Sequence, residues 1–136
     1  MPMSDSNALS IFVFGTLMDP KIRFRVLGRT IPSAWVRPAW VMGFVRQPVL
    51  GRSYPMLVPR PRGRVRGQVI RNLSPRDLAR LDAYEGEEYV RSPIWVWLAS
   101  RRKIWARTYL THHWVKASGK NWRPAYGVLR SRSFCQ

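Results

Sequence analysis

The chain has 136 residues, of which 46% are hydrophobic and 12% aromatic. This is enough apolar surface for the core of one domain, and the chain is too short for two separate cores. Twenty-four Lys and Arg residues oppose seven Asp and Glu residues, which gives a net charge of +17, so acidic partners have to be considered.

The composition also bears on the protein's location in the cell. The longest apolar stretch, residues 8–18, is too short to span a bilayer and contains Gly15. The first residues lack the basic segment and cleavage site of a signal peptide. We therefore expect a cytoplasmic protein without membrane contact. The single cysteine, Cys135, excludes an internal disulfide and a metal site built from several thiolates.

The first predicted element is a buried strand over residues 11–14, which ends at Gly15. Asp19 and Pro20 are then typical of the N-cap and first position of a short helix, and Gly28 is a suitable C-terminal cap. The sequence thus predicts a strand, a glycine loop and a helix in direct succession.

Three short apolar runs in the middle of the chain predict strands at residues 40–45, 54–58 and 65–70. Between the last two lies a basic run, residues 60–66, with prolines at its beginning. Because proline disfavours regular pairing, we interpret this run as a loop and strand entry with solvated arginines.

A second helix is predicted after Ser74, which can cap it, with Pro75 at the first position and Asp77 completing a capping box. It should end at Gly86. Two strands follow, over residues 89–98 and 104–111, joined by a hairpin turn at residues 100–103. This order predicts an α+β fold with a strongly curved sheet or small barrel.

The acidic residues are unevenly distributed, since five of the seven lie between positions 77 and 88. Leu78, Leu81 and Glu85 are spaced i, i+3 and i+7, so the Glu85 carboxylate should share the buried face of the second helix. Burial and the helix dipole would raise its pKa, as enzymes do for a glutamate that transfers protons near neutral pH. Alternatively, Glu85 forms an ion pair with an arginine, which would lower the pKa.

The loop Phe14-Gly15-Thr16-Leu17 lies between the first strand and the first helix. Backbone N–H groups in such a loop can bind an anion or a developing oxyanion. By itself the loop is also typical of an ordinary tight turn, and it lacks the pattern of a nucleotide-binding P-loop.

Taken together, this loop and residues 81–86, followed by Tyr89 and Arg91, resemble the γ-glutamylcyclotransferase-like family, specifically its AIG2-like branch. Further similarities lie in residues 54–59, 67–69 and 106–110. The resemblance follows the family's order and spans residues 11–112.

The resemblance implies a small curved mixed β-barrel flanked by short helices, and an enzyme that releases 5-oxoproline from a γ-glutamyl amide or amine. It implies no cofactor and no metal. Glu85 corresponds to the family's catalytic glutamate. The substrate-binding positions correspond to Phe14, Gly15, Thr16, Leu17, Tyr54, Tyr89 and Tyr109. Phe14 replaces the tyrosine usual in the family, so the substrate preference stays open.

On this interpretation residues 1–9 form an extension, residues 10–112 the catalytic domain, and residues 113–136 a basic aromatic tail packed on the same domain. The expected partner is a small γ-glutamyl compound. Neither the group that leaves from it nor the oligomeric state follows from the sequence.

Two other functions stay open. Twenty arginines, together with Trp114, Trp122 and Arg123, could bind nucleic acid, although no known nucleic-acid motif is present and the arginines are spread along the chain. A non-catalytic ligand binder of the same fold is the third class. A metal site is disfavoured because the adjacent His112 and His113 would point to opposite faces of a strand.

Overall fold

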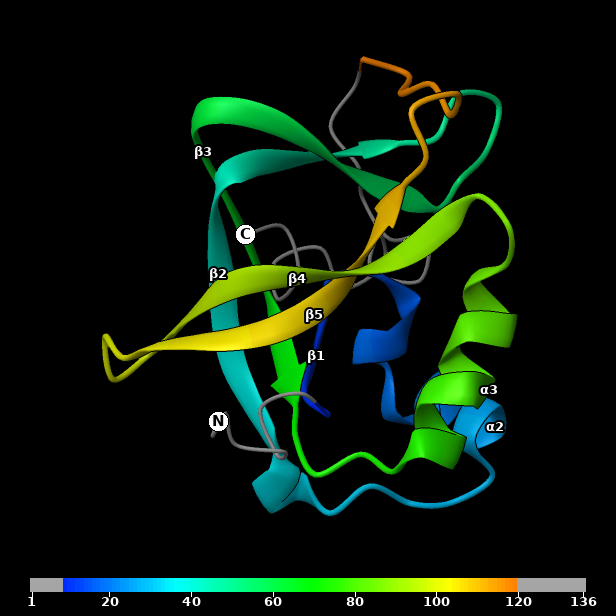
Figure 1. Ribbon diagram of the computed structural model, residues 1–136, viewed down its shortest axis with the longest axis vertical. Coiled ribbons are helices and arrows are strands. Elements are labelled where there is room, and N and C mark those ends of the chain that lie inside the picture. Colours follow the sequence, from blue (N-terminus) through cyan, green and yellow to red (C-terminus); the bar gives the residue numbers. More distant parts are fainter. Residues whose placement is uncertain (1–8, 120–136) are drawn as a thin grey trace.

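The structure, a computed structural model, describes residues 9–119 (Figure 1). Its elements are β1 (Ile11–Val13), the 3-10 helix η1 (Thr16–Met18), α2 (Pro20–Leu27), the 3-10 helix η2 (Ser33–Trp35), β2 (Val36–Pro48), β3 (Pro55–Ile70), α3 (Pro75–Glu85), β4 (Tyr89–Leu98) and β5 (Lys103–Thr111). None of the helices in this part of the chain has the length and apolar character needed to cross a bilayer.

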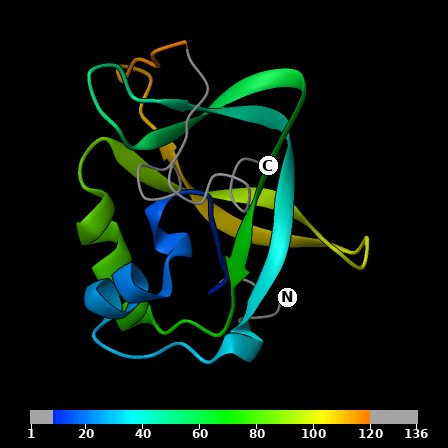
Figure 2. The same ribbon diagram turned by 180° about the vertical axis from the view of Figure 1, so that it is seen from behind.

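The five strands close into a barrel in the order β1-β3-β2-β4-β5. All pairings are antiparallel except that of β1 with β5, where Ile11 pairs in parallel with Arg107. The two opposite views show α2 and α3 together on one side, while the β4–β5 hairpin extends away on the other (Figures 1 and 2). The predicted α+β fold with a small mixed barrel is therefore confirmed.

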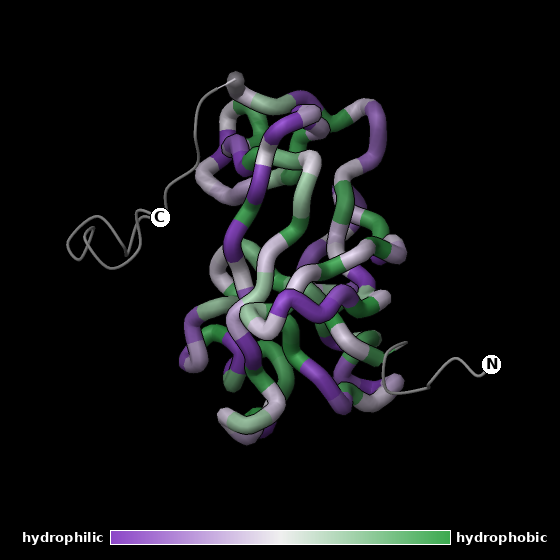
Figure 3. The backbone as a smooth tube through the Cα atoms, turned by 90° about the vertical axis from the view of Figure 1, so that its left-hand side faces the viewer, coloured by the Kyte–Doolittle hydropathy of each residue, from purple (hydrophilic) through white to green (hydrophobic). Residues whose placement is uncertain are grey.

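The apolar side chains form two main clusters, and β1 contributes to both. Phe12 points into the barrel interior, whereas Ile11 and Val13 pack in the layer between the barrel and the helices. Successive side chains of a strand point to opposite faces, so a strand covered on both sides is apolar throughout. Along much of the backbone, hydrophobic and hydrophilic residues alternate over short distances (Figure 3).

Both predicted helices form with the predicted caps. The Asp19 side chain accepts a hydrogen bond from the Lys21 N–H, and Gly28 takes the left-handed conformation, with φ 70°, that ends α2. At the start of α3 the side chains of Ser74 and Asp77 each accept a hydrogen bond from the other's backbone N–H. These local interactions fix where each helix begins.

The interpretation of residues 60–66 as a loop is wrong, because they belong to the long strand β3. The pairing with β2 is irregular here: Met42 pairs with Arg64 but Phe44 pairs with Pro59. Gly63 lies so close to the Phe44 carbonyl that a Cβ would be 2.3 Å from its oxygen. The prolines are tolerated because, among the described strands, this part of β3 pairs only with β2.

The chain beyond β5 returns to the barrel. Ala117 forms a β-bridge with Val49, and Val115 is buried beside Val49 and Met56. Of the expected N-terminal extension and C-terminal tail, residues 1–8 and 120–136 lie outside the described residues, as do Trp122, Arg123 and Cys135.

Candidate active site

A cavity of about 440 Å³ opens where β1 ends, between the η1 loop, the last turn of α3 and the segment that precedes β3. All eight residues nominated from the sequence line it: residues 14–17, Tyr54, Glu85, Tyr89 and Tyr109. They come from five separate segments of the chain, and only the fold brings them together. A volume of this size suits a small molecule.

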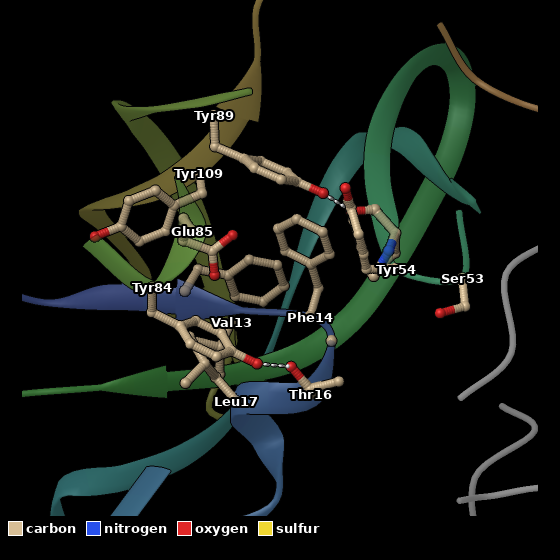
Figure 4. Close-up of a pocket in the computed structure, with 13 residues that line it drawn as sticks. Val13, Phe14, Thr16, Leu17, Ser53, Tyr54, Tyr84, Glu85, Tyr89 and Tyr109 are labelled. Atoms are coloured by element: carbon tan, nitrogen blue, oxygen red, sulfur yellow. Dashed lines mark hydrogen bonds between the residues drawn. The ribbon is translucent and has the colours of Figure 1, made fainter. Parts of the chain in front are cut away.

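Glu85 is the last residue of α3, and its carboxylate points into the cavity between aromatic rings (Figure 4). Burial raises its pKa from 4.5 to about 7, because an apolar surrounding disfavours the charged form. The acidic partners in the ion pairs of residues 9–119 are Asp77, Glu88 and Asp82. Of the two interpretations that the sequence left open, the structure therefore favours a largely desolvated carboxylate that has no basic partner among the described residues.

The loop of residues 14–17 is held by hydrogen bonds to its carbonyl oxygens. Arg46 donates to the Phe14 carbonyl at 2.9 Å, and the Gly15 and Thr16 carbonyls accept from the next turn. Arg23 donates to the Leu17 and Met18 carbonyls at 3.0 and 3.2 Å. Since these carbonyls are engaged, the polar backbone groups left for a ligand are the N–H groups.

Arg23, which the sequence analysis missed, is 7% exposed, and burial lowers the pKa of its guanidinium. It also donates to Gln68 of β3 at 3.3 Å and so connects α2, the loop and the barrel. Arg23 and the buried Leu27 are four residues apart, so they share one face of the helix, and this spacing is a signal from which the burial of Arg23 could have been predicted.

Two tyrosines form a wall beside Glu85. The Tyr89 hydroxyl donates to the Pro55 carbonyl and the Tyr109 hydroxyl to the Asp82 carboxylate, both at 2.6 Å. Burial raises the pKa of both phenols. Both side chains therefore stay protonated at neutral pH and present ring surface to the cavity.

Tyr54 belongs to a charged cluster on the side of the cavity formed by the segment before β3. Its hydroxyl donates to the Glu88 carboxylate at 2.7 Å, and Arg52 contacts both groups. Burial, followed by the hydrogen bond to Glu88, raises the Tyr54 pKa. This cluster has no local signal in the sequence, because it forms only where the β2–β3 connection meets the α3–β4 connection.

Tyr84 is a further lining residue that the sequence analysis did not nominate. Its hydroxyl and the Thr16 hydroxyl lie 2.8 Å apart and connect the last turn of α3 to the loop (Figure 4). Tyr84 precedes Glu85 and is 45% exposed, so helical spacing alone placed it on the solvent side. Ser53 also lines the cavity.

The site contains carboxylate, hydroxyl and backbone amide groups. Within residues 9–119, no three His, Cys, Asp or Glu side chains gather as a metal site would require. The groups that are present can transfer protons and form hydrogen bonds.

Comparisons with known proteins identify relatives over most of the chain. Residues 11–130 match the family model for "Gamma-glutamyl cyclotransferase, AIG2-like". Protein AIG2 C of Arabidopsis thaliana is 31% identical over 116 residues, which are 85% of this chain and 67% of that protein. AIG2-like protein A of Arabidopsis thaliana is 39% identical over 95 residues, or 69% of this chain and 56% of that protein. The chain thus spans between about half and two thirds of these relatives.

Solved structures show the same architecture. A solution structure of an Arabidopsis thaliana protein has a TM-score of 0.72 at 28% identity, covering 98% of this chain and 87% of that one. A structure described as a gamma-glutamyl cyclotransferase has a TM-score of 0.64 at 20% identity, covering 80% of this chain and 69% of that one, and shows a shared fold. With the family model matched from β1 to beyond β5, the chain belongs to the AIG2-like family of γ-glutamyl cyclotransferases.

Proposed function

We propose that this protein is a cyclotransferase that releases 5-oxoproline from a γ-glutamyl amide or amine, with Glu85 as general acid and base. One observation carries the proposal: a largely desolvated carboxylate with a pKa of about 7 shares a small cavity with the loop of residues 14–17. A glutamate with a pKa near neutrality can both accept and return a proton.

The substrate supplies its own nucleophile. The Glu85 carboxylate takes a proton from the substrate's α-ammonium group, and the freed nitrogen attacks the γ-carbonyl carbon to close a five-membered ring. When the bond between that carbon and the leaving nitrogen breaks, Glu85 returns its proton to the departing nitrogen, and the ring nitrogen passes its own surplus proton to the released amine. The products are 5-oxoproline and the protonated amine, and no covalent enzyme intermediate is needed.

The loop would stabilise the charge that develops on the γ-carbonyl oxygen. Its carbonyls are engaged by Arg46, Arg23 and turn hydrogen bonds, which leaves N–H groups for this role. The walls formed by Tyr89 and Tyr109 would hold the substrate folded, so that the amine lies near the carbonyl carbon.

Phe14 contributes an apolar wall where related sequences usually carry tyrosine. It is 7% exposed and packs against Phe12 with ring centroids 6.2 Å apart. Compared with a tyrosine, phenylalanine leaves the cavity without one hydroxyl group. Its apolar ring adds to the desolvation that raises the Glu85 pKa. The proposal therefore requires no phenol at this position.

The decisive substitution is Glu85→Gln, which keeps the shape of the side chain and removes its proton-transfer capacity. We expect it to lower 5-oxoproline release by roughly 100-fold or more, the usual contribution of a general acid and base. The assay incubates the protein with a panel of γ-glutamyl amino acids, peptides and amines, and quantifies 5-oxoproline by chromatography. Glu87→Gln is the matched control, because Glu87 is exposed and does not line the cavity.

Two results would contradict the proposal. If the Glu85→Gln variant retains the wild-type rate, another group transfers the proton. If the folded wild-type protein releases no 5-oxoproline from any member of the panel but binds one of them in calorimetry, the chain is a non-catalytic ligand binder of the same fold.

A further inference from the structure

The outer surface of the barrel carries a second feature that the proposed reaction does not use. Residues on one face of β2, β3, β4 and β5 form what we call the basic tryptophan face: Trp40, Arg64, Arg66, Trp95, Trp97, Lys103 and Trp105. In Figure 1 the β4–β5 hairpin, which carries four of these residues, extends away from the helices.

The strand register aligns this face in rows. Arg66 lies opposite Trp40, Trp40 opposite Trp97, and Trp97 opposite Lys103, so one row crosses β3, β2, β4 and β5. Trp95 and Trp105 form the neighbouring pair toward the middle of the hairpin. Directly opposite residues of paired strands project from the same face, and neighbouring strands are about 4.8 Å apart, so the row spans roughly 14 Å.

The contacts within the face join cations to aromatic rings. The Lys103 ammonium lies 4.6 Å from the Trp95 ring centroid and 5.5 Å from that of Trp97. The Arg64 guanidinium lies 4.9 Å from the Trp40 ring. The ring centroids of Trp95 and Trp105 are 4.6 Å apart, yet the two residues are 49% and 39% exposed. Large rings held open to solvent in this way commonly mark an interaction site.

Charge is segregated across the molecule. Apart from Asp5 and Asp19, every acidic residue lies between positions 77 and 88, in α3 and the turn after it. Strands β2, β3, β4 and β5 contain no acidic residue, and the hairpin turn adds Arg101 and Arg102. The charged residues of the basic tryptophan face are therefore all positive, and the acidic residues belong to a different part of the fold.

We infer that the basic tryptophan face binds single-stranded nucleic acid. Unpaired bases can stack on the exposed indole rings, while Arg64, Arg66 and Lys103 neutralise the adjacent phosphates. Sheets that bind single strands commonly combine aromatic rings on an open face with flanking cations. The face requires unpaired bases, because bases stacked inside a duplex offer no free ring surface.

The geometry favours this ligand over an anionic membrane. A membrane-binding hairpin would carry its aromatic residues at the tip, where they could enter the headgroup layer. Here the tip consists of Ala99, Ser100, Arg101 and Arg102, and the indoles lie along the face of the strands. Stacking on rings that lie along a sheet suits a strand running across it.

The test measures fluorescence anisotropy of a fluorescein-labelled 12-nucleotide oligouridylate titrated with the full chain, at several salt concentrations. We expect saturable binding that weakens steeply with salt, as phosphate contacts require. A variant combining Trp95→Ala with Trp105→Ala should bind about 10-fold or more weakly, the loss expected when base stacking is removed. A variant combining Arg66→Gln with Lys103→Gln should reduce the salt dependence, because fewer counterions are displaced.

Trp114→Ala is the matched control, since Trp114 is 53% exposed but stacks on His112 away from this face. It should bind as the wild type does, and so should Glu85→Gln. Circular dichroism of each variant verifies the fold, and the Trp95 and Trp105 substitutions should leave 5-oxoproline release unchanged.

Three outcomes would overturn the inference. Equal binding by the wild type and the Trp95/Trp105 variant would mean that charge alone holds the oligonucleotide. Equal competition by a duplex of the same length would mean that unpaired bases are not recognised. Binding to phosphatidylserine vesicles that depends on Trp95 and Trp105, without oligonucleotide binding, would assign the face to a membrane surface.

Discussion

At the scale of single residues, the pKa of Glu85 predicts the pH dependence of catalysis. The carboxylate must be ionised to accept a proton, and burial raises its pKa to about 7. We therefore expect kcat/KM to rise with pH up to about 7 and to level off above it. Initial rates of 5-oxoproline release between pH 5.5 and 8 test this. A rate independent of pH over that interval would show that the working group titrates elsewhere.

The same residue shows which part of a site a sequence can reveal. The spacing of Leu78, Leu81 and Glu85 was enough to predict that the carboxylate points inward, because helical periodicity is a local property. That no arginine among residues 9–119 forms an ion pair with Glu85 does not follow from this periodicity. It depends on where the chain places its cations in space, and Arg29, Arg52 and Arg91 pair with other acidic residues.

At the scale of elements, α2 positions the substrate loop through Arg23. The substitution Arg23→Met leaves the Leu17 and Met18 carbonyls without the guanidinium that donates to them. We expect a loss of about 1–3 kcal/mol in the free energy of unfolding, the cost of unsatisfied buried polar groups. We also expect kcat to fall more than KM rises, because the N–H groups of the loop act mainly in the transition state.

Two further variants distinguish positioning from general destabilisation. Arg25→Met alters an exposed arginine of the same helix and should leave both stability and kcat unchanged. Arg23→Lys should recover part of kcat, because one donor remains. If Arg23→Met unfolds at the wild-type temperature and keeps the wild-type kcat, the loop does not depend on this hydrogen-bond network.

Elements with local signals were predicted well, and elements that depend on distant pairing were not. The caps at Asp19 and Ser74 identify where the two helices begin, since each cap is a contact between residues only a few positions apart. For the region of β3 the sequence predicts two strands and a loop, because its prolines disfavour pairing. The strand is continuous because it pairs with β2 along most of its length, with a register shift beside Gly63. Neither the pairing nor the shift can be predicted from a short window of sequence.

At the scale of the whole molecule, closure of the barrel assembles the cavity. The sequence predicted a curved sheet or barrel, and the parallel contact between Ile11 and Arg107 closes it. This closure brings Tyr109 of β5 beside residues at the end of β1, almost one hundred positions away. The acidic helix end and the basic strands then lie on opposite sides, so the two proposed sites use separate surfaces (Figure 1).

The raised pKa of Glu85 also predicts how the stability of the whole fold depends on pH. The unfolded chain ionises this carboxyl near 4.5, whereas the folded protein does so near 7, so between these values the folded state binds more protons. Stability contributed by the protonated group is therefore present below about pH 4.5 and is lost as pH rises to about 7. Above pH 7 the loss should reach about 3 kcal/mol at most.

Glu85→Gln removes this dependence, since the amide stays neutral. We expect urea denaturation to give the variant and the wild type equal stability near pH 4, and the variant to be more stable at pH 8. Glu87→Gln, at an exposed position, should follow the wild type at both values. A Glu85→Gln variant that is less stable than the wild type at pH 8 would mean that the carboxylate is stabilised by a partner in the folded protein, and a base with a raised pKa would no longer account for catalysis.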